Sequence, residues 1–203
     1  MDLHEISNPL DGAKAGQLYI PHGAAEFDLA VLTDADELFR AQLAGPDPKV
    51  DVDNGRVTIS YPRFSVSYII HRPQTSHMAL NSHIPWRIEV GQGIKGLRGD
   101  LRELTFEGLD VNGGAVDVDL TLPEPSGNIA IRFKGGVKDV TLRRPKGTEA
   151  RLAVKGGATH IKFDAQTAGA IGGGLSWQSS GFDDAADRYD IEIGGGAVHV
   201  TVE

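Results

Sequence analysis

The chain of 203 residues contains no cysteine, which excludes disulfide bonds, thiolate metal sites and a cysteine nucleophile. It has no basic run and a formal net charge of −8 at pH 7, so we expect neither nucleic acid nor an anionic membrane as a main partner. No apolar stretch reaches the ~18 residues of a spanning helix, and the start lacks the basic and apolar segments of a signal peptide. The sequence therefore predicts a soluble, cytoplasmic protein without direct membrane insertion.

Motifs of nucleophilic and nucleotide chemistry are also missing. Gly-x-Ser-x-Gly does not occur, and no glycine cluster continues into the Lys-Ser or Lys-Thr pair of a phosphate-binding loop. A glycosidase needs two carboxyl groups of which one is buried, whereas most acidic residues here fall at regular positions that should face water. We therefore expect no enzyme and no cofactor.

Glycine, in contrast, is abundant, at 26 of 203 residues. Many of these glycines open a repeated phrase, in which three variable residues are followed by an apolar, a polar and another apolar residue. The copies begin at Gly23, Gly55, Gly114, Gly136, Gly157 and Gly196. Gly114, Gly136 and Gly157 follow one another at intervals of 22 and 21 residues, and a period near twenty with one glycine turn is typical of a β-solenoid.

Each phrase alternates as a half-buried strand does. The residues four and six places after the glycine are apolar in every copy, and those three and five places after it are polar, so one face should meet the core. A second short strand precedes most glycines, at 17–20, 50–53, 87–90, 128–133, 150–154 and 189–193. The predicted fold is all-β, a single-domain solenoid of about seven to nine glycine-cornered coils. A β-sandwich is the alternative, because it also has short strands joined by regular turns.

The regular pattern covers residues 16–203, and residues 1–15 precede it as an N-terminal extension. An irregular connector is expected at about 62–85, where prolines and polar residues interrupt the repeat. Residues 33–44 combine helix-forming residues with a strand-like alternation, and we favour a strand. Residues 165–187 are rich in glycine, serine and alanine, which allows either one long loop or an additional coil.

The repeats resemble a known bacterial family. Residues 190–202 read Asp-Ile-Glu-Ile-Gly-Gly-Gly-Ala-Val-His-Val-Thr-Val, which is similar to the repeats of the "toastrack" or "putative adhesin" β-solenoid domains. Residues 37–52, followed by Gly-Arg-Val-Thr-Ile-Ser-Tyr, resemble the first coils of that family. The resemblance implies a non-catalytic sensory or scaffolding module that accompanies bacterial envelope-stress responses, often tethered to membrane segments. Such a segment is not found in this chain.

Two groups of residues are candidates for a site. If consecutive coils stack in register, Asp117, Asp139 and His160 lie in one outward column with rungs about 4.7–4.9 Å apart, and such a set could bind a divalent metal. The alternative is an exposed polar column without a ligand. Trp177 and Phe182 would suit a partner contact if exposed, and would cover an open end of the solenoid if buried.

The sequence therefore predicts a non-enzymatic scaffold or protein-interaction module in a regulatory or envelope-stress context. Either a protein partner or self-association is expected, because a solenoid has two ends whose unpaired strand edges invite another strand. The alternative is a polysaccharide-binding or polysaccharide-active β-helix protein, which would need a groove with exposed aromatic residues and clustered carboxylates.

Overall fold

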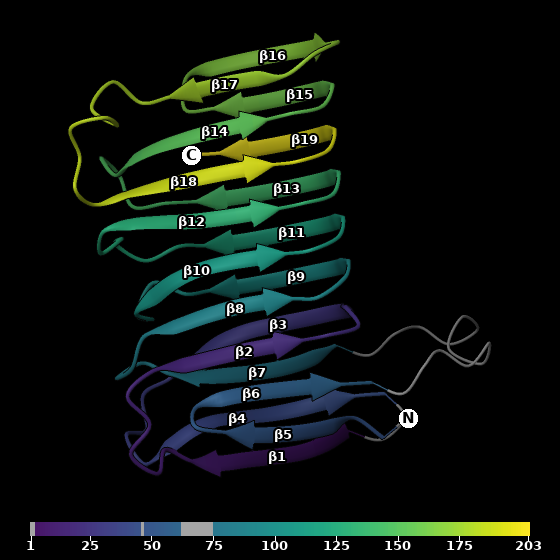
Figure 1. Ribbon diagram of the computed structural model, residues 1–203, viewed down its shortest axis with the longest axis vertical. Helices are drawn as coiled ribbons and strands as arrows, with labels where there is room; N and C mark the ends of the chain where they lie inside the picture. The colour runs from purple at the N-terminus through teal and green to yellow at the C-terminus, as the bar shows by residue number, and fades with distance from the viewer. Residues whose placement is uncertain (1–2, 46, 62–74) are drawn as a thin grey trace.

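The computed structural model describes residues 3–45, 47–61 and 75–203, which form two β-sheets that face each other (Figure 1). In spatial order, sheet A contains β1 (Leu3–Pro9), β4 (Glu37–Ala44), β7 (Ser76–Asn81), β3 (Ala24–Leu32), β9 (Ile94–Asp100), β11 (Ala115–Thr121), β13 (Val137–Arg143), β19 (Ala197–Val202), β15 (Ala158–Phe163) and β16 (Gln166–Ile171). Sheet B contains β17 (Leu175–Gln178), β14 (Glu149–Val154), β18 (Arg188–Ile193), β12 (Asn128–Phe133), β10 (Phe106–Val111), β8 (Trp86–Val90), β2 (Gly16–Ile20), β6 (Arg56–Ser60) and β5 (Lys49–Asp53). No helix of the described part of the chain is long and apolar enough to cross a membrane.

The middle of the molecule is a solenoid, which confirms the predicted fold class. Each central coil runs along a strand of sheet B, turns at a glycine corner and returns along a strand of sheet A, so that neighbouring coils pair in parallel. The corners stack closely on one another. A Cβ atom on Gly135 would stand 2.7 Å from the backbone of Gly113, so a side chain there would push the coils apart.

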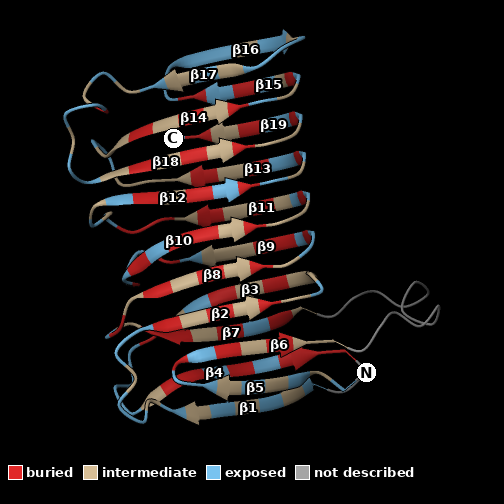
Figure 2. Ribbon diagram, viewed as in Figure 1, coloured by how far each residue is buried: buried red, intermediate tan, exposed pale blue. Residues whose placement is uncertain are grey.

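The core lies between the two sheets and is filled by the residues that the alternation predicts to face inward (Figure 2). One layer of it consists of Leu97, Val118, Val140, Val200 and Ile161, each about 1% exposed and each opposite the next on adjacent strands. Tyr61 is the one residue of the predicted inward set that is only half-buried.

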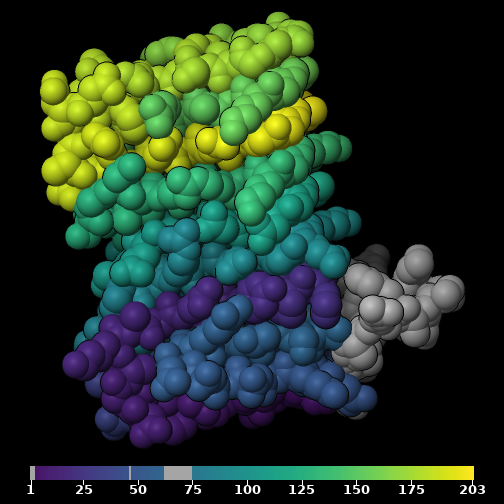
Figure 3. All heavy atoms as spheres, viewed as in Figure 1, coloured from purple at the N-terminus to yellow at the C-terminus, as the bar shows by residue number. Residues whose placement is uncertain are grey.

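The order of the coils differs from the order of the chain. The last coil, β18 with β19, lies between the coil of β12 and β13 and the coil of β14 and β15, as the yellow band between green neighbours shows in Figure 3. The glycine-rich stretch 165–187 makes this possible: β16 and β17 pair antiparallel to β15 and β14 and form the far end, and residues 179–187 lead back to β18. Of the two alternatives left open for this stretch, the structure shows additional strands followed by a short loop.

The other end departs from the simple coil as well. Strand β4 lies within 33–44, where the alternation favours a strand, and it pairs antiparallel with β1 and β7. Strand β1 belongs to the expected N-terminal extension and is one of the two edge strands of sheet A. The expected connector contains β7 and continues into the turn before Trp86, while its residues 62–74 lie outside the described ones.

The phrase that begins at Gly55 is not a glycine corner, contrary to the sequence prediction. Strands β5 and β6 form an antiparallel hairpin within sheet B. Asn54 and Gly55 join them, both with positive φ (47° and 81°), and Asn-Gly is the sequence favoured by the tight turn of a two-residue hairpin. The repeated phrase therefore marks a strand after a turn, whether that turn changes sheets or not.

Candidate functional site

A column of left-handed residues runs along the outer face of sheet A. Its members occupy one position of successive strands, the third after the corner glycine, and we call it the bulge column. In spatial order it contains Glu26, Gly96, Asp117, Asp139, His199 and His160. The five members with side chains have φ between 49° and 59°, where only glycine is free of strain and Asp, Asn and His are the best tolerated of the rest.

The column exists because each strand contains one extra residue. In β13, Val137 and Val140 are both buried although they are three places apart, and strict alternation would turn one of them outward. The left-handed residue Asp139 takes up the extra step as a β-bulge. The alternation found in the sequence missed this feature. The bulge does have a sequence signal. Apolar residues stand one and four places after the glycine, and the residue three places after it is Asp, His, Glu or Gly.

One arginine bridges two of the three carboxylates of the column. Arg98 donates from one guanidinium nitrogen to Glu26 Oε2 at 3.0 Å and from the other to Asp117 Oδ2 at 2.6 Å. The hydrogen bond to Glu26 is the main cause that raises the pKa of Arg98, because it stabilises the charged guanidinium. Beside the column, Arg143 binds both carboxylate oxygens of Asp119. These carboxylates therefore have a structural partner already.

The other half of the column brings two imidazoles together. The ring centroids of His160 and His199 are 4.8 Å apart, and His199 Nδ1 lies 3.0 Å from Asp139 Oδ1. The three side chains border a shallow, water-exposed hollow of about 420 Å³. The rest of its lining is Asp117, Val118, Asp119, Thr141 and Thr201. The hollow thus presents oxygen and nitrogen ligands and no cationic side chain.

The predicted metal ligands are therefore arranged differently from what the sequence suggested. Asp117, Asp139 and His160 do share a column, but His199 lies between Asp139 and His160. The expected succession of rungs is wrong because the last coil of the chain is inserted there. No group of three or more His, Asp or Glu side chains in the described residues is placed to hold a metal ion.

The far end of the solenoid, formed by β16, β17 and the turn 172–174 between them, is the second feature of note; we call it the C-terminal edge. Both strands have a neighbour on one side only. Ile171, Leu175 and Trp177 pack against the core but remain partly exposed, since no further coil covers them. No charged residue occurs from residue 165 to residue 182.

The two aromatic candidates take different positions at this end. Trp177 lies opposite Leu152 on the inward face of β17 and covers the end of the core. Phe182 is 3% exposed, and the guanidinium groups of Arg151 and Arg188 lie 4.9 and 4.8 Å from its ring centre. Phe182 therefore fixes the loop that leads to β18 and offers no aromatic surface to a ligand.

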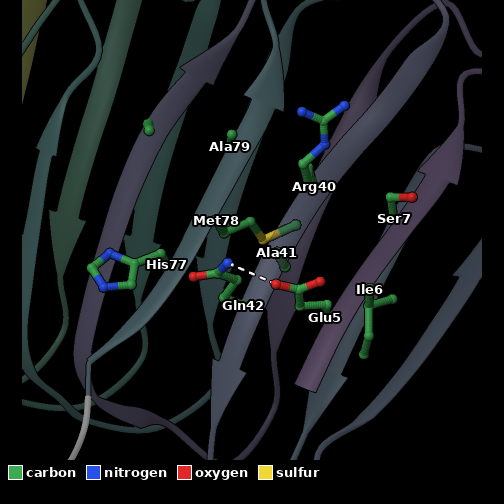
Figure 4. A pocket seen from close by; sticks show the side chains of 10 residues that line it. Glu5, Ile6, Ser7, Arg40, Ala41, Gln42, His77, Met78 and Ala79 are labelled. Carbon is green, nitrogen blue, oxygen red and sulfur yellow. Dashed lines mark hydrogen bonds between the residues drawn. The ribbon is translucent and has the colours of Figure 1, made fainter. Parts of the chain in front are cut away.

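A further hollow of about 410 Å³ crosses the outer face of β1, β4, β7 and β3, and its lining is drawn in Figure 4. Ala79 and Ala30 face each other across β7 and β3 and leave the depression, because their side chains are small. Polar groups stand around it, among them Arg40 and the hydrogen-bonded pair Gln42 and Glu5, 3.0 Å apart. The hollow is wide and open, and it lacks the convergent polar groups of an enclosed ligand site.

Comparison with known proteins places this architecture in a family. No curated protein matches the chain. A crystal structure of a "putative cell adhesion protein" from Clostridium sporogenes superimposes with a TM-score of 0.74 at 19% identity, over 100% of both chains, which shows a shared fold. A "putative adhesin" from Bacteroides fragilis reaches a TM-score of 0.37 at 10% identity, over 98% of this chain and 97% of that one. The family described as the N-terminal domain of toast_rack, DUF2154, matches residues 2–143, and the chain therefore belongs to the toast-rack family.

Proposed function

We propose that this chain is a non-enzymatic protein-interaction module that assembles with copies of itself through the C-terminal edge, in a bacterial regulatory or envelope-stress context. The observation that carries the proposal is the contrast between the two ends of the solenoid. Both ends have unpaired strands, and such strands add a further strand readily unless charge, proline or a bulge protects them.

The N-terminal end is protected by charge. The exposed residues of its edge strand β5 are Lys49, Asp51 and Asp53, and the other edge strand, β1, presents Glu5. A strand added there would meet charged side chains of both signs. An uncharged strand from another chain is therefore disfavoured at this end.

The C-terminal edge has no such protection. Four of the six residues of β16 are exposed, and the glycines at 169, 172 and 173 have open space where a side chain would be. The chain as a whole has a net charge of −8, so two copies repel each other least where neither presents a charge. Two copies of β16 related by a twofold axis would extend sheet A, and the partly exposed Leu175 and Trp177 would meet their equivalents.

The outer faces support a role without catalysis. Several of their carboxylates are paired with arginine or lysine, as in Arg151 with Asp190 and Lys155 with Glu192, and the hollows are shallow. The similar C. sporogenes protein is described by an interaction function, cell adhesion. Polysaccharide binding is the less favoured alternative, because Trp86 and Phe182 are buried and the exposed large apolar residues of the described chain are Leu3, Val116 and Val198. The cytoplasmic location and the lack of nucleic-acid and membrane contacts stay predictions.

Light scattering after size-exclusion chromatography, over a range of protein concentrations, tests the proposal. The wild-type chain of 21.7 kDa should form a dimer as its concentration rises. The double variant Thr167→Glu with Ala170→Glu should stay monomeric, because it places two negative charges on the exposed face of β16. The carboxylate introduced in place of Thr167 would lie opposite Lys162, so the fold itself should tolerate it.

The matched control changes the other end. Ser7→Glu adds a negative charge to β1, opposite Arg40, and should leave the dimer intact. A wild-type chain that stays monomeric at all concentrations would refute self-assembly. A dimer that the β16 variant leaves unchanged would place the interface elsewhere.

A further inference from the structure

The two neighbouring imidazoles of the bulge column have the spacing of a metal chelate. Two imidazoles that bind one zinc ion at about 2.0–2.1 Å, with an angle near the tetrahedral one, place their ring centroids roughly 5 Å apart. The centroids of His160 and His199 are 4.8 Å apart, with the ring planes inclined by 44°. Both side chains are exposed, so rotation about their side-chain bonds can direct one nitrogen of each ring at a common point.

Asp139 orients the imidazole ring of His199. A carboxylate can only accept a hydrogen bond, so the 3.0 Å contact requires that His199 Nδ1 carries the proton and donates it to Asp139 Oδ1. The lone pair of His199 is then on Nε2. A carboxylate that orients a histidine through the second ring nitrogen is a frequent companion of metal-bound histidine.

The surroundings leave room for a cation. The column ends at His160, and the next strand, β16, has Gly169 opposite it, which has no side chain and no atom within 4 Å of where one would begin. The hollow in front of the rings is lined by carboxylates and hydroxyl groups. Lys138 Nζ lies 3.8 Å from Asp139 Oδ2 and leaves Oδ1 to His199, while Arg98 and Arg143 are paired with Asp117 and Asp119.

We propose that His160 and His199 form a two-imidazole binding site for a divalent transition-metal cation of the Zn²⁺ or Cu²⁺ type, with Asp139 as the positioning residue. Imidazole nitrogens select such cations over Ca²⁺ and Mg²⁺, which prefer oxygen ligands. Water completes the coordination, since the site is on the surface. Asp117 does not contribute, because Arg98 binds its carboxylate. The proposal is independent of self-association, since the column lies on a face of sheet A and not on its edge.

Titration of the full-length chain with ZnCl₂ in an isothermal calorimeter, after removal of trace metal with a chelator, tests the site. We expect saturable binding of one Zn²⁺ per chain. His160→Asn and His199→Asn should each lower the affinity at least about tenfold, because each removes one of two ligands. Asparagine is the chosen replacement because it tolerates the left-handed backbone of both positions, so the fold should persist. Asp139→Asn should lower the affinity by about 10- to 100-fold.

His77 provides the matched control. It lies on the same face of sheet A with Nδ1 3.3 Å from Asp28 Oδ2, but it has no second imidazole beside it among the described residues. His77→Asn should leave Zn²⁺ binding unchanged. The electron paramagnetic resonance spectrum of bound Cu²⁺ should show two coupled nitrogens in the wild type and one in His160→Asn or His199→Asn.

Three results would overturn the proposal. The first is the absence of saturable Zn²⁺ binding at millimolar concentration. The second is Zn²⁺ binding whose affinity is unchanged in both His160→Asn and His199→Asn. The third is a loss that His77→Asn reproduces, which would assign the metal to scattered surface histidines.

Discussion

Gly16 lies flat against the indole ring of Trp86, the first residue of the neighbouring strand in sheet B. A Cβ atom built on Gly16 would stand 2.5 Å from two atoms of that ring. Trp86 is fully buried and donates its indole N–H to the backbone oxygen of Asn81 at 2.9 Å, so the ring cannot turn aside without losing this bond. The contact closes the core at the point where the regular coils meet the N-terminal end.

Gly16→Ala should therefore destabilise the chain by about 1–3 kcal/mol, the usual cost of adding a methyl group to a filled core. Chemical denaturation monitored by tryptophan fluorescence measures this. Gly173→Ala is the control, because Gly173 has open space around it and an ordinary backbone conformation. Equal stability of the two variants would show that the indole of Trp86 is not held against β2.

Val200 and Thr201 are neighbours on β19 and face opposite sides of sheet A. Val200→Asp buries an unpaired carboxylate in the central layer of the core, where Val200 is 1% exposed, and should cost about 4 kcal/mol or more. Thr201→Asp places the same carboxylate outward, opposite Lys162, and should change stability little. Thermal unfolding followed by circular dichroism compares the two. Similar melting temperatures would contradict the register of β19.

Acid should weaken the contact between the last residue and β15. Lys162 Nζ donates to Glu203 Oε2 at 2.6 Å, and this hydrogen bond is the main cause that holds the pKa of the Glu203 carboxyl below its usual value of 4.5. A lowered pKa means that the folded chain favours the ionised carboxyl. Its contribution to stability is therefore present above pH 4.5 and is lost as the pH falls through the folded-state pKa.

Glu203→Gln should then be less stable than the wild type at pH 7, and the difference should shrink as the pH is lowered below 4.5. Urea denaturation at several pH values measures the difference. Glu107→Gln serves as the control, because Glu107 is exposed and forms no ion pair within the described residues. A Glu203→Gln deficit that is independent of pH would mean that shape, and not charge, fixes this contact.

The periodic residues made the central coils predictable from the sequence. Alternation along a strand reports burial directly, so Val118, Val140 and Ile161 could be assigned to the core without knowing which strands are neighbours. The glycine corners could be predicted for a similar reason, because only glycine fits where successive backbones stack. These features depend on local pattern alone.

The order of the coils could not be predicted in this way. Every parallel coil presents the same apolar ladder to its neighbours, so β19 fits beside β13 as well as β15 would. The sequence therefore could not show that His199 separates Asp139 from His160. The candidate metal site was incomplete for this reason, since His199 carries the contact that orients it.

The insertion of the last coil leads to a prediction about dynamics. The ends of most chains fray, and their amide hydrogens exchange quickly with solvent. Here β19 bonds to β13 on one side and to β15 on the other, and even Glu203 donates its N–H to Leu142 O at 3.1 Å and accepts from Arg144 N at 2.8 Å. The end of the chain should thus be among its most protected parts.

Hydrogen–deuterium exchange with peptide mass spectrometry should show slow exchange for residues 197–202, comparable with that of 137–143 in β13. Exchange should be fast for 166–171, because β16 is bonded on one side only and its other edge is open. The comparison should be made at a protein concentration where the chain is monomeric, since a dimer formed through β16 would slow its exchange. If residues 197–202 exchanged as fast as 166–171, the last coil would not be held between its two neighbours, and His199 would not be fixed between Asp139 and His160.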